Sequence, residues 1–161
     1  MSGETYKKHL DQGIYDIQDG KFESAIENIN KSIEEKNDWE IPYFYRAVAH
    51  QTLENFNEAM LDYTKALQLN SKMTDAYYNR ARITLSRKDI ENPDVASAVE
   101  DLKHALELDE KFIDALYAMA AAQKKLQNHS APIEYLDKLL ELEPDAINAK
   151  ALKKLILQKY M

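Results

Sequence analysis

The four histidines are the side chains best suited to acid–base or metal chemistry near neutral pH, but their positions do not combine. His9, His50, His104 and His129 lie in separate parts of the sequence. None has a second histidine and an acid in the H-E-x-x-H spacing that places a metal on one helical face. Asp101 and His104 could share a helical face, which is a common surface pairing. The histidines therefore predict neither a catalytic nor a metal site.

Cysteine and glycine usage excludes further kinds of chemistry. The chain has no cysteine, and its glycines are Gly3, Gly13 and Gly20. It therefore has no disulfide framework, no thiol nucleophile and no cysteine-based zinc site. Three glycines so placed cannot form a glycine-rich phosphate-binding loop. We expect a protein that is not an enzyme and that needs no cofactor and no metal.

Charge and hydropathy narrow the classes of partner. The 161 residues include 28 acidic and 21 basic side chains, a net charge of −7. This balance opposes general binding to a phosphate backbone, so no nucleic acid partner is expected. No apolar run approaches the roughly 20 residues needed to cross a bilayer. The first residues, MSGETYKKHLDQG, lack the apolar segment of a secretory signal. We expect a cytoplasmic protein without membrane insertion.

The elements that carry these residues follow a pattern that returns every 34 positions. Its clearest copy, from Tyr43 to Asn70, has the pattern of two amphipathic helices joined by a short polar turn. Residues of similar size recur in phase, namely Gly13, Ala47 and Ala81; Ala25 and Ala59; Phe22 and Phe56; Ile33 and Leu67; Tyr43 and Tyr77. A fixed period of this length predicts a repeat architecture, in which each unit packs on the next.

The pattern resembles the tetratricopeptide repeat (TPR) family, whose unit is a helix–turn–helix of 34 residues. The family's small residue at repeat position 8 corresponds to Gly13, Ala47, Ala81 and Ala120. Its alanine at position 20 corresponds to Ala25, Ala59 and Ala98, with Pro132 in the fourth repeat. The closing segments are ALQLN from Ala66, ALELD from Ala105 and LLELEP from Leu139. The resemblance implies an all-α fold, a right-handed superhelical solenoid of four repeats plus a C-terminal capping helix.

This resemblance also sets the expected boundaries within a single domain, 1–161. The repeats are expected at about 6–39, 40–73, 74–112 and 113–146, with the capping helix at 147–161. In repeat one, the first helix is expected to end at Gln18, and the second to run from Phe22 to Glu35 after an Asp19-Gly20 turn. Repeat two is expected to turn at Glu54 to Asn57. Pro42 and Pro132 are expected in first turns of helices, where proline is tolerated.

Repeat three is longer than the others. Ala81 and Ala120 are 39 residues apart, so five residues are inserted, and they fit at 88–92 between the two helices. Asn92 is then expected as an N-cap, with Pro93 and Asp94 opening the next helix. Insertions in repeat proteins fall in such turns, often on a functional edge. Two interpretations stay open, a longer turn without a role and a contribution to binding.

In the family, the first helix of each repeat lines the concave face through repeat positions 2, 5, 6, 9, 12 and 13. The resemblance then implies a peptide-binding groove that includes Leu10, Ile14, Phe44, Tyr45, Val48, Tyr78, Asn79, Arg82, Tyr117, Lys124 and Lys125. Its N-terminal half is apolar and aromatic, and its C-terminal half is basic with a tyrosine. Exposed apolar patches usually mark binding sites. The alternative is that these side chains pack between neighbouring first helices.

Other positions have a more structural expectation. Arg46 and Arg80 recur in FYRA and YNRA, and we expect their stems to pack and pair between repeats. One subclass of the family clamps the C-terminal carboxylates of chaperones with lysine, asparagine and arginine. The corresponding positions here include Leu10, Tyr45 and Asp75, and Asp75 would repel a carboxylate. No chaperone-tail carboxylate clamp is expected.

We therefore expect a protein–protein interaction module, a scaffold or adaptor that binds a peptide or helix of another protein in its groove. Arg82, Lys124 and Lys125 favour acidic residues at one end of that ligand. Two alternatives stay open. The groove could take the tail or first helix of another copy, which makes a self-assembling scaffold, or the chain could be a small secretion-type chaperone.

Overall fold

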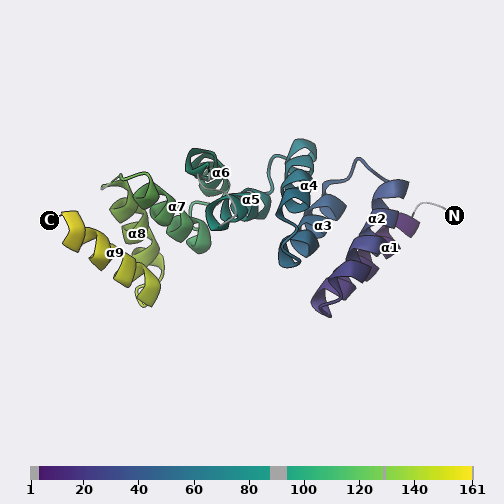
Figure 1. The fold of residues 1–161 in the computed structure, drawn as a ribbon, viewed down its shortest axis with the longest axis horizontal. Coiled ribbons are helices and arrows are strands. Elements are labelled where there is room, and N and C mark those ends of the chain that lie inside the picture. Colours follow the sequence, from purple (N-terminus) through teal and green to yellow (C-terminus); the bar gives the residue numbers. More distant parts are fainter. Residues whose placement is uncertain (1–3, 88–93, 129, 161) are drawn as a thin grey trace. The chain divides into compact units, whose positions relative to one another are not determined.

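The computed structural model describes residues 4–87, 94–128 and 130–160. These ranges form nine α-helices and no strand (Figure 1). The helices are α1 Thr5–Gln18, α2 Phe22–Glu35, α3 Glu40–Thr52, α4 Phe56–Leu69, α5 Thr74–Ser86, α6 Val95–Leu108, α7 Ile113–Lys125, α8 Ala131–Leu142 and α9 Ile147–Tyr160. The prediction of an all-α fold with four helix pairs and a capping helix is confirmed. The predicted insertion at 88–92, with Asn92 and Pro93, lies outside the described residues.

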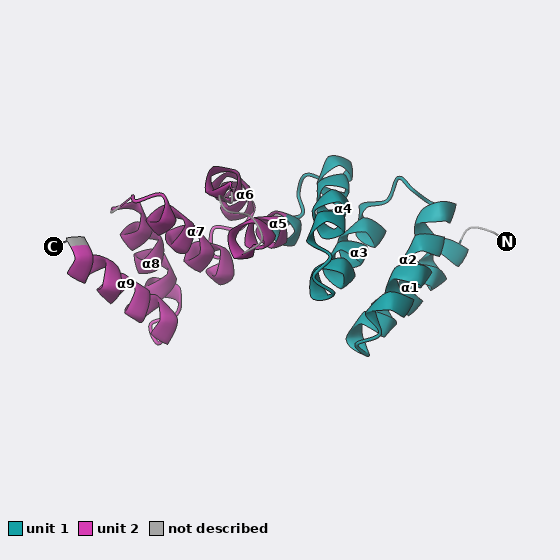
Figure 2. Ribbon diagram, viewed as in Figure 1, with its two compact units in different colours: residues 1–76 teal, residues 77–161 magenta. Residues whose placement is uncertain are grey.

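The helices group into two compact units, unit 1 (Met1–Ala76) and unit 2 (Tyr77–Met161) (Figure 2). In unit 1, α1 packs on α2, α2 on α3 and α3 on α4. In unit 2, α6 packs on α7, α7 on α8 and α8 on α9. Each unit is treated separately below, and the expected single domain over 1–161 stays a prediction.

Small residues let the two helices of a pair approach closely. Ala47 and Ala59 have no exposed surface, and neither do Ala81 and Ala98. Gly13 shows the closest approach: a Cβ atom there would lie 2.5 Å from Ile29 Cγ1 and 3.2 Å from the Ala25 carbonyl oxygen. Real Cβ contacts are longer, so α1 and α2 lie nearer to each other than an alanine at 13 permits. The recurrence of small residues thus has a direct steric cause.

The turn inside a repeat uses a left-handed backbone conformation at one repeat position. Gly20, Glu54 and Gln127 have φ values of 75°, 60° and 60°. The predicted Asp19-Gly20 turn is confirmed, since only glycine adopts this conformation without a steric cost. The predicted turn from Glu54 to Asn57 was too long, because α4 already begins at Phe56.

The start of α6 also differs from the prediction. Asp94, not Asn92, is the N-cap, and its side chain accepts a hydrogen bond from the Ser97 N–H at 3.0 Å. An aspartate three residues before a free N–H satisfies one of the unpaired donors at the helix start. Asp94 therefore precedes the helix, which begins at Val95.

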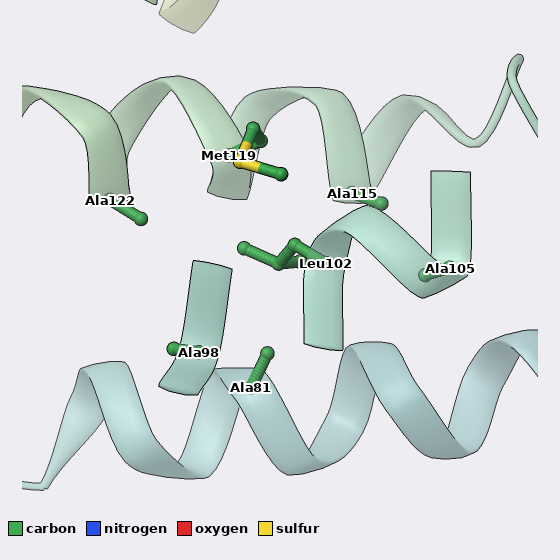
Figure 3. Packing of buried hydrophobic residues seen from close by; sticks show 7 residues of the cluster. All are labelled: Ala81, Ala98, Leu102, Ala105, Ala115, Met119 and Ala122. Atoms are coloured by element: carbon green, nitrogen blue, oxygen red, sulfur yellow. The ribbon is translucent and has the colours of Figure 1, made fainter. Parts of the chain in front are cut away.

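The core of unit 2 consists of two clusters that share helix α7. The first joins α5, α6 and α7, and Leu102 lies in it between Ala81 and Met119 (Figure 3). The second joins α7, α8 and α9 through Leu116, Ala120, Leu136, Leu139, Ala149 and Ile156. Helix α9 therefore covers the apolar side of the fourth repeat, as a capping helix does.

The packed face of α9 is narrower than the sequence indicated. Ala149 and Ile156 are each 1% exposed, and Leu152 packs beside them. Ala151 and Leu155, which share the expected apolar stripe, are exposed. Lys153 forms an ion pair with Asp137 of α8 at the edge of this contact. One face of α9 is thus buried and the opposite face is open to solvent.

Two neighbouring residues of α9 test this assignment. Ile156→Ala removes a side chain that is 1% exposed, and we expect it to lower the free energy of unfolding by about 2–5 kcal/mol. Leu155→Ala removes a side chain that is 51% exposed, and we expect a change within about 0.5 kcal/mol. Urea unfolding followed by circular dichroism measures both. Equal losses would contradict the packing of α9 described here.

The close approach at Gly13 gives a second test. Gly13→Ala gains about 1 kcal/mol of helix propensity, but the clash with Ile29 costs about 1–3 kcal/mol. We expect net destabilisation in the wild-type background. In an Ile29→Ala background the nearest obstacle is gone, so the same change becomes neutral or stabilising. Chemical unfolding of the four chains in this cycle provides the comparison, and an identical effect of Gly13→Ala in both backgrounds would exclude Ile29 as the obstacle.

Candidate functional site

Unit 2 contains a pocket of about 690 Å³ formed by α5, α7, α9 and the end of α8. We call it the unit 2 pocket. Its aromatic and charged lining residues are Tyr78, Arg82, Asp114, Tyr117, Glu143 and Asp145. Its remaining lining residues are Ile113, Ala118, Ala121, Leu139, Ala146, Ile147, Asn148 and Ala149. A pocket of this size with a mostly apolar lining and few polar groups has the usual form of a ligand site.

Helical spacing explains why these side chains meet. Tyr78 and Arg82 are four residues apart on α5, and Asp114, Tyr117 and Ala121 are three and four apart on α7. Residues at these intervals lie on one face of a helix. First helices of repeats therefore supply two walls of the pocket, in agreement with the face that the sequence indicated.

The wall from α9 was missed by the sequence analysis, which treated that helix only as a cap. Asn148 of α9 lies 34 residues after Asp114 of α7, so the two occupy the same repeat position. Both line the pocket, as do Ile147 and Ala149. Extending the 34-residue register through α9 would have found this wall. The capping helix therefore also acts as the first helix of a further, partial repeat.

Tyr78 belongs both to the core and to the pocket. Its ring lies 5.0 Å from the ring of Phe112, centroid to centroid, and packs against the first core cluster of unit 2. The Arg82 guanidinium lies 5.7 Å from the centroid of the Tyr78 ring. Burial, and then the negative charge of Asp114, raise the pKa of the Tyr78 hydroxyl, whereas Arg82 acts in the opposite direction.

Tyr117 and Ile147 are the most accessible apolar side chains in the lining. Tyr117 is 37% exposed and Ile147 is 80% exposed. Their apolar surface therefore faces solvent beside the carboxylates of Asp114 and Glu143. This arrangement provides contact area for a ligand without groups arranged for proton transfer or nucleophilic attack.

Charges in the lining are mostly negative, with three carboxylates and one guanidinium. Asp145 is balanced in part by Lys150, whose Nζ lies 3.7 Å from Oδ1. Asp114 and Glu143 form no side-chain hydrogen bond or ion pair with any residue that the structure describes. The unit 2 pocket therefore has unbalanced negative charge.

The residues predicted from sequence in the C-terminal half divide into two sets. Tyr78, Arg82 and Tyr117 come together in the pocket. Asn79 and Lys124 are half-buried and lie outside the lining. Lys125 also lies outside it, and its Nζ donates a hydrogen bond to the Leu85 carbonyl oxygen at 3.1 Å. That bond satisfies a carbonyl near the C-terminal end of α5.

The residues predicted in the N-terminal half lie in unit 1. Leu10 is 2% exposed and packs in the interior of the unit, so it offers no accessible surface there. Ile14, Tyr45 and Val48 are half-buried. Phe44 is half-buried as well, and its ring lies 5.8 Å from the ring of Tyr63. A continuous groove that joins these residues to the unit 2 pocket stays a prediction.

Buried charged groups elsewhere form structural pairs. Arg46 donates to both carboxylate oxygens of Asp62 at 2.7 Å, and to Asn30 of the preceding repeat at 2.6 Å. Arg80 forms the equivalent pair with Asp101. Bidentate pairs of this kind fix side-chain geometry. The expected structural role of the two arginines is confirmed.

In repeat one, a single carboxylate replaces this pair. Asp16 accepts hydrogen bonds from Gln12, Ser24 and Asn28 at 2.8–2.9 Å. These bonds, Ser24 first, lower the pKa of the Asp16 carboxyl. Asp16 therefore links α1 to α2, and its hydrogen-bonding capacity serves the fold.

Searches for other kinds of site gave two results. The described residues contain no group of three or more histidine, cysteine or acidic side chains that could hold a metal ion. None of the described helices is long and apolar enough to cross a membrane.

Family models match two parts of the chain. The model for the Fis1 C-terminal tetratricopeptide repeat matches residues 113–160, which cover α7 to α9. A second tetratricopeptide repeat model matches residues 43–73. The first match includes helices α7 and α9, which form two walls of the unit 2 pocket.

A curated relative and two solved structures extend the likeness. Human sperm-associated antigen 1 is 28% identical over 142 residues, which are 88% of this chain but only 13% of that protein. A MamA double mutant of strain RS-1 has a TM-score of 0.88 at 17% identity, over 99% of this chain and 86% of that chain. The first TPR domain of Spaghetti (RPAP3), bound to the HSP90 peptide SRMEEVD, has a TM-score of 0.70 at 22% identity, over 77% of this chain and 94% of that chain.

The identities to the solved structures are low, so these two comparisons support the fold alone. The helix pairs, their small residues and the matches to two repeat models agree with one another. The TPR is a unit that typically serves protein–protein interaction and is typically not catalytic. On this evidence the chain belongs to the tetratricopeptide repeat family.

Proposed function

We propose that this chain binds a peptide or helix of a partner protein, without catalysis, and that the unit 2 pocket is the centre of the binding surface. The observation that carries this proposal is the accessible apolar lining around Tyr117 and Ile147, which are 37% and 80% exposed. Solenoid repeats present their binding surfaces along such rows of helices. A pocket of about 690 Å³ has the size of a site for a few side chains.

Tyr117 is the main anchor in this proposal. A tyrosine offers a large contact area with few rotatable bonds, and its hydroxyl can pair with a peptide backbone. Tyr78 supports the same surface, but its ring is also packed against the core of unit 2. Truncation of Tyr117 therefore affects binding alone, whereas truncation of Tyr78 affects both binding and stability.

The proposal extends to the first helices of unit 1. Ile14, Phe44, Tyr45 and Val48 are half-buried there, so each retains some accessible apolar surface. A ligand longer than the unit 2 pocket would use these side chains, together with Asn79, for further contacts. The Spaghetti (RPAP3) structure supports the idea that this fold can hold a short peptide, since that protein carries one.

Selection of ligands from a random peptide library on the full chain tests the proposed function. For a selected peptide, Tyr117→Ala should weaken binding by about 2 kcal/mol, the loss typical of an aromatic hot spot. The melting temperature should change little, because the ring is 37% exposed. Fluorescence polarisation gives the dissociation constants, and differential scanning calorimetry gives the melting temperatures.

Tyr15→Ala is the matched control, since it removes a tyrosine of unit 1 that is 58% exposed. It should leave the affinity unchanged. Equal affinities of wild type and Tyr117→Ala for every selected peptide would contradict the proposal. Growth of particle size with protein concentration, without any peptide, would favour self-assembly instead.

A further inference from the structure

We propose that the unit 2 pocket selects a positively charged side chain, lysine or arginine, next to an apolar residue of the ligand. This inference rests on the proposed function and adds the chemical class of the ligand. It starts from the charge of the lining, in which Asp114, Glu143 and Asp145 outnumber Arg82.

Two of these carboxylates are available to a ligand. Asp114 and Glu143 are exposed, and neither side chain pairs with another residue in the described part of the chain. Asp145 differs, because Lys150 lies beside it at 3.7 Å. A ligand cation is therefore assigned to Asp114 and Glu143, where it would form charge-assisted hydrogen bonds.

The end of α8 adds to this preference. Glu143 is the C-cap of α8, so it lies beside the unpaired carbonyl groups at the end of that helix. The carboxyl-terminal end of a helix has a partial negative charge and stabilises cations nearby. Glu143 and these carbonyls thus act in the same direction, and the chain places no lysine or arginine of the lining at this end of the pocket other than Arg82 of α5.

Arg82 is the one countercharge in the lining, and its position shows how a cation can be held there. Its guanidinium lies 5.7 Å from the centroid of the Tyr78 ring, within the range of a cation–π contact. Tyr117 offers a second ring in the same lining. At the Tyr78 hydroxyl, the negative charge of Asp114 outweighs the positive charge of Arg82, because the net effect raises the pKa.

The apolar part of the lining fits the rest of such a ligand. The stems of lysine and arginine bury methylene groups along apolar surfaces while the charged end remains polar. Ala118, Ala121 and Ile147 provide such a surface in the pocket. An apolar residue next to the cation would cover Ile147, which is 80% exposed.

This inference differs from the expectation of an acidic ligand end. That expectation relied on Arg82 together with Lys124 and Lys125. Neither lysine lines the pocket, and the Lys125 Nζ donates a hydrogen bond to the Leu85 carbonyl oxygen. The positive charge that would attract an acidic ligand is therefore reduced to Arg82 in the unit 2 pocket.

The test uses the full chain and a random peptide library. Peptides selected on wild type should be enriched in lysine or arginine next to an apolar residue, and parallel selections on Asp114→Asn and Glu143→Gln should lose this enrichment. One selected peptide is then synthesised with its lysine or with methionine. On wild type, the change to methionine should weaken binding about tenfold, the loss of roughly one charge-assisted hydrogen bond.

The same change in the peptide should have a much smaller effect on Glu143→Gln, because the two changes remove one interaction. Glu141→Gln is the matched control, since it removes an exposed carboxylate of the same helix that is not in the lining. It should behave as wild type. Thermal melting of Asp114→Asn checks that the start of α7 is intact, and Glu143→Gln tests the inference independently of that helix start.

The outcomes are distinguishable. Selected peptides that depend on Tyr117 but are acidic, or whose affinity ignores Asp114 and Glu143, would overturn the inference and keep the proposed function. Failure to select any peptide that depends on Tyr117 would overturn both. A lysine dependence that is lost in Glu143→Gln and kept in Glu141→Gln would support the inference.

Discussion

The close approach of two helices inside each repeat is the constraint on which the other features depend. It requires small residues where the helices cross, and a Cβ atom at Gly13 would already meet Ile29 at 2.5 Å. When the paired helices lie so close, each pair presents a fixed face to the next pair. That fixed face determines which side chains of α5, α7 and α9 reach the unit 2 pocket. Packing inside a repeat thus sets the geometry of the site between repeats.

Much of the fold could be predicted because periodicity records this constraint directly. The bounds of α2, from Phe22 to Glu35, and the turn at Gly20 follow from the phase of the repeat. The turn at Glu54 was less accessible, because its left-handed backbone carries no glycine to mark it. The cap at Asp94 was missed because several polar residues near that helix start could serve as caps, and only geometry selects one.

The candidate site was harder to predict than the fold, since a helical face does not specify the partners of its side chains. Tyr78, Arg82 and Tyr117 were found by their repeat positions, and the structure brings them together. Leu10 has the same kind of repeat position but is buried, and Lys125 pairs with a backbone carbonyl. Sequence alone therefore identified a face of the helices, and side-chain contacts identified which residues on it are accessible and which charge prevails.

Helix α9 has two roles, since Ile156 and Ala149 complete the core while Ile147 and Asn148 form a wall of the unit 2 pocket. Any population of molecules with α9 undocked lacks that wall and cannot bind a ligand there. The apparent dissociation constant is then the intrinsic constant divided by the docked fraction. Because the docked fraction depends on temperature and on the contacts of α9 with α8, affinity becomes a measure of the local stability of the C-terminal helix. Sequence changes far from the ligand could thus tune binding without altering a single contact in the pocket.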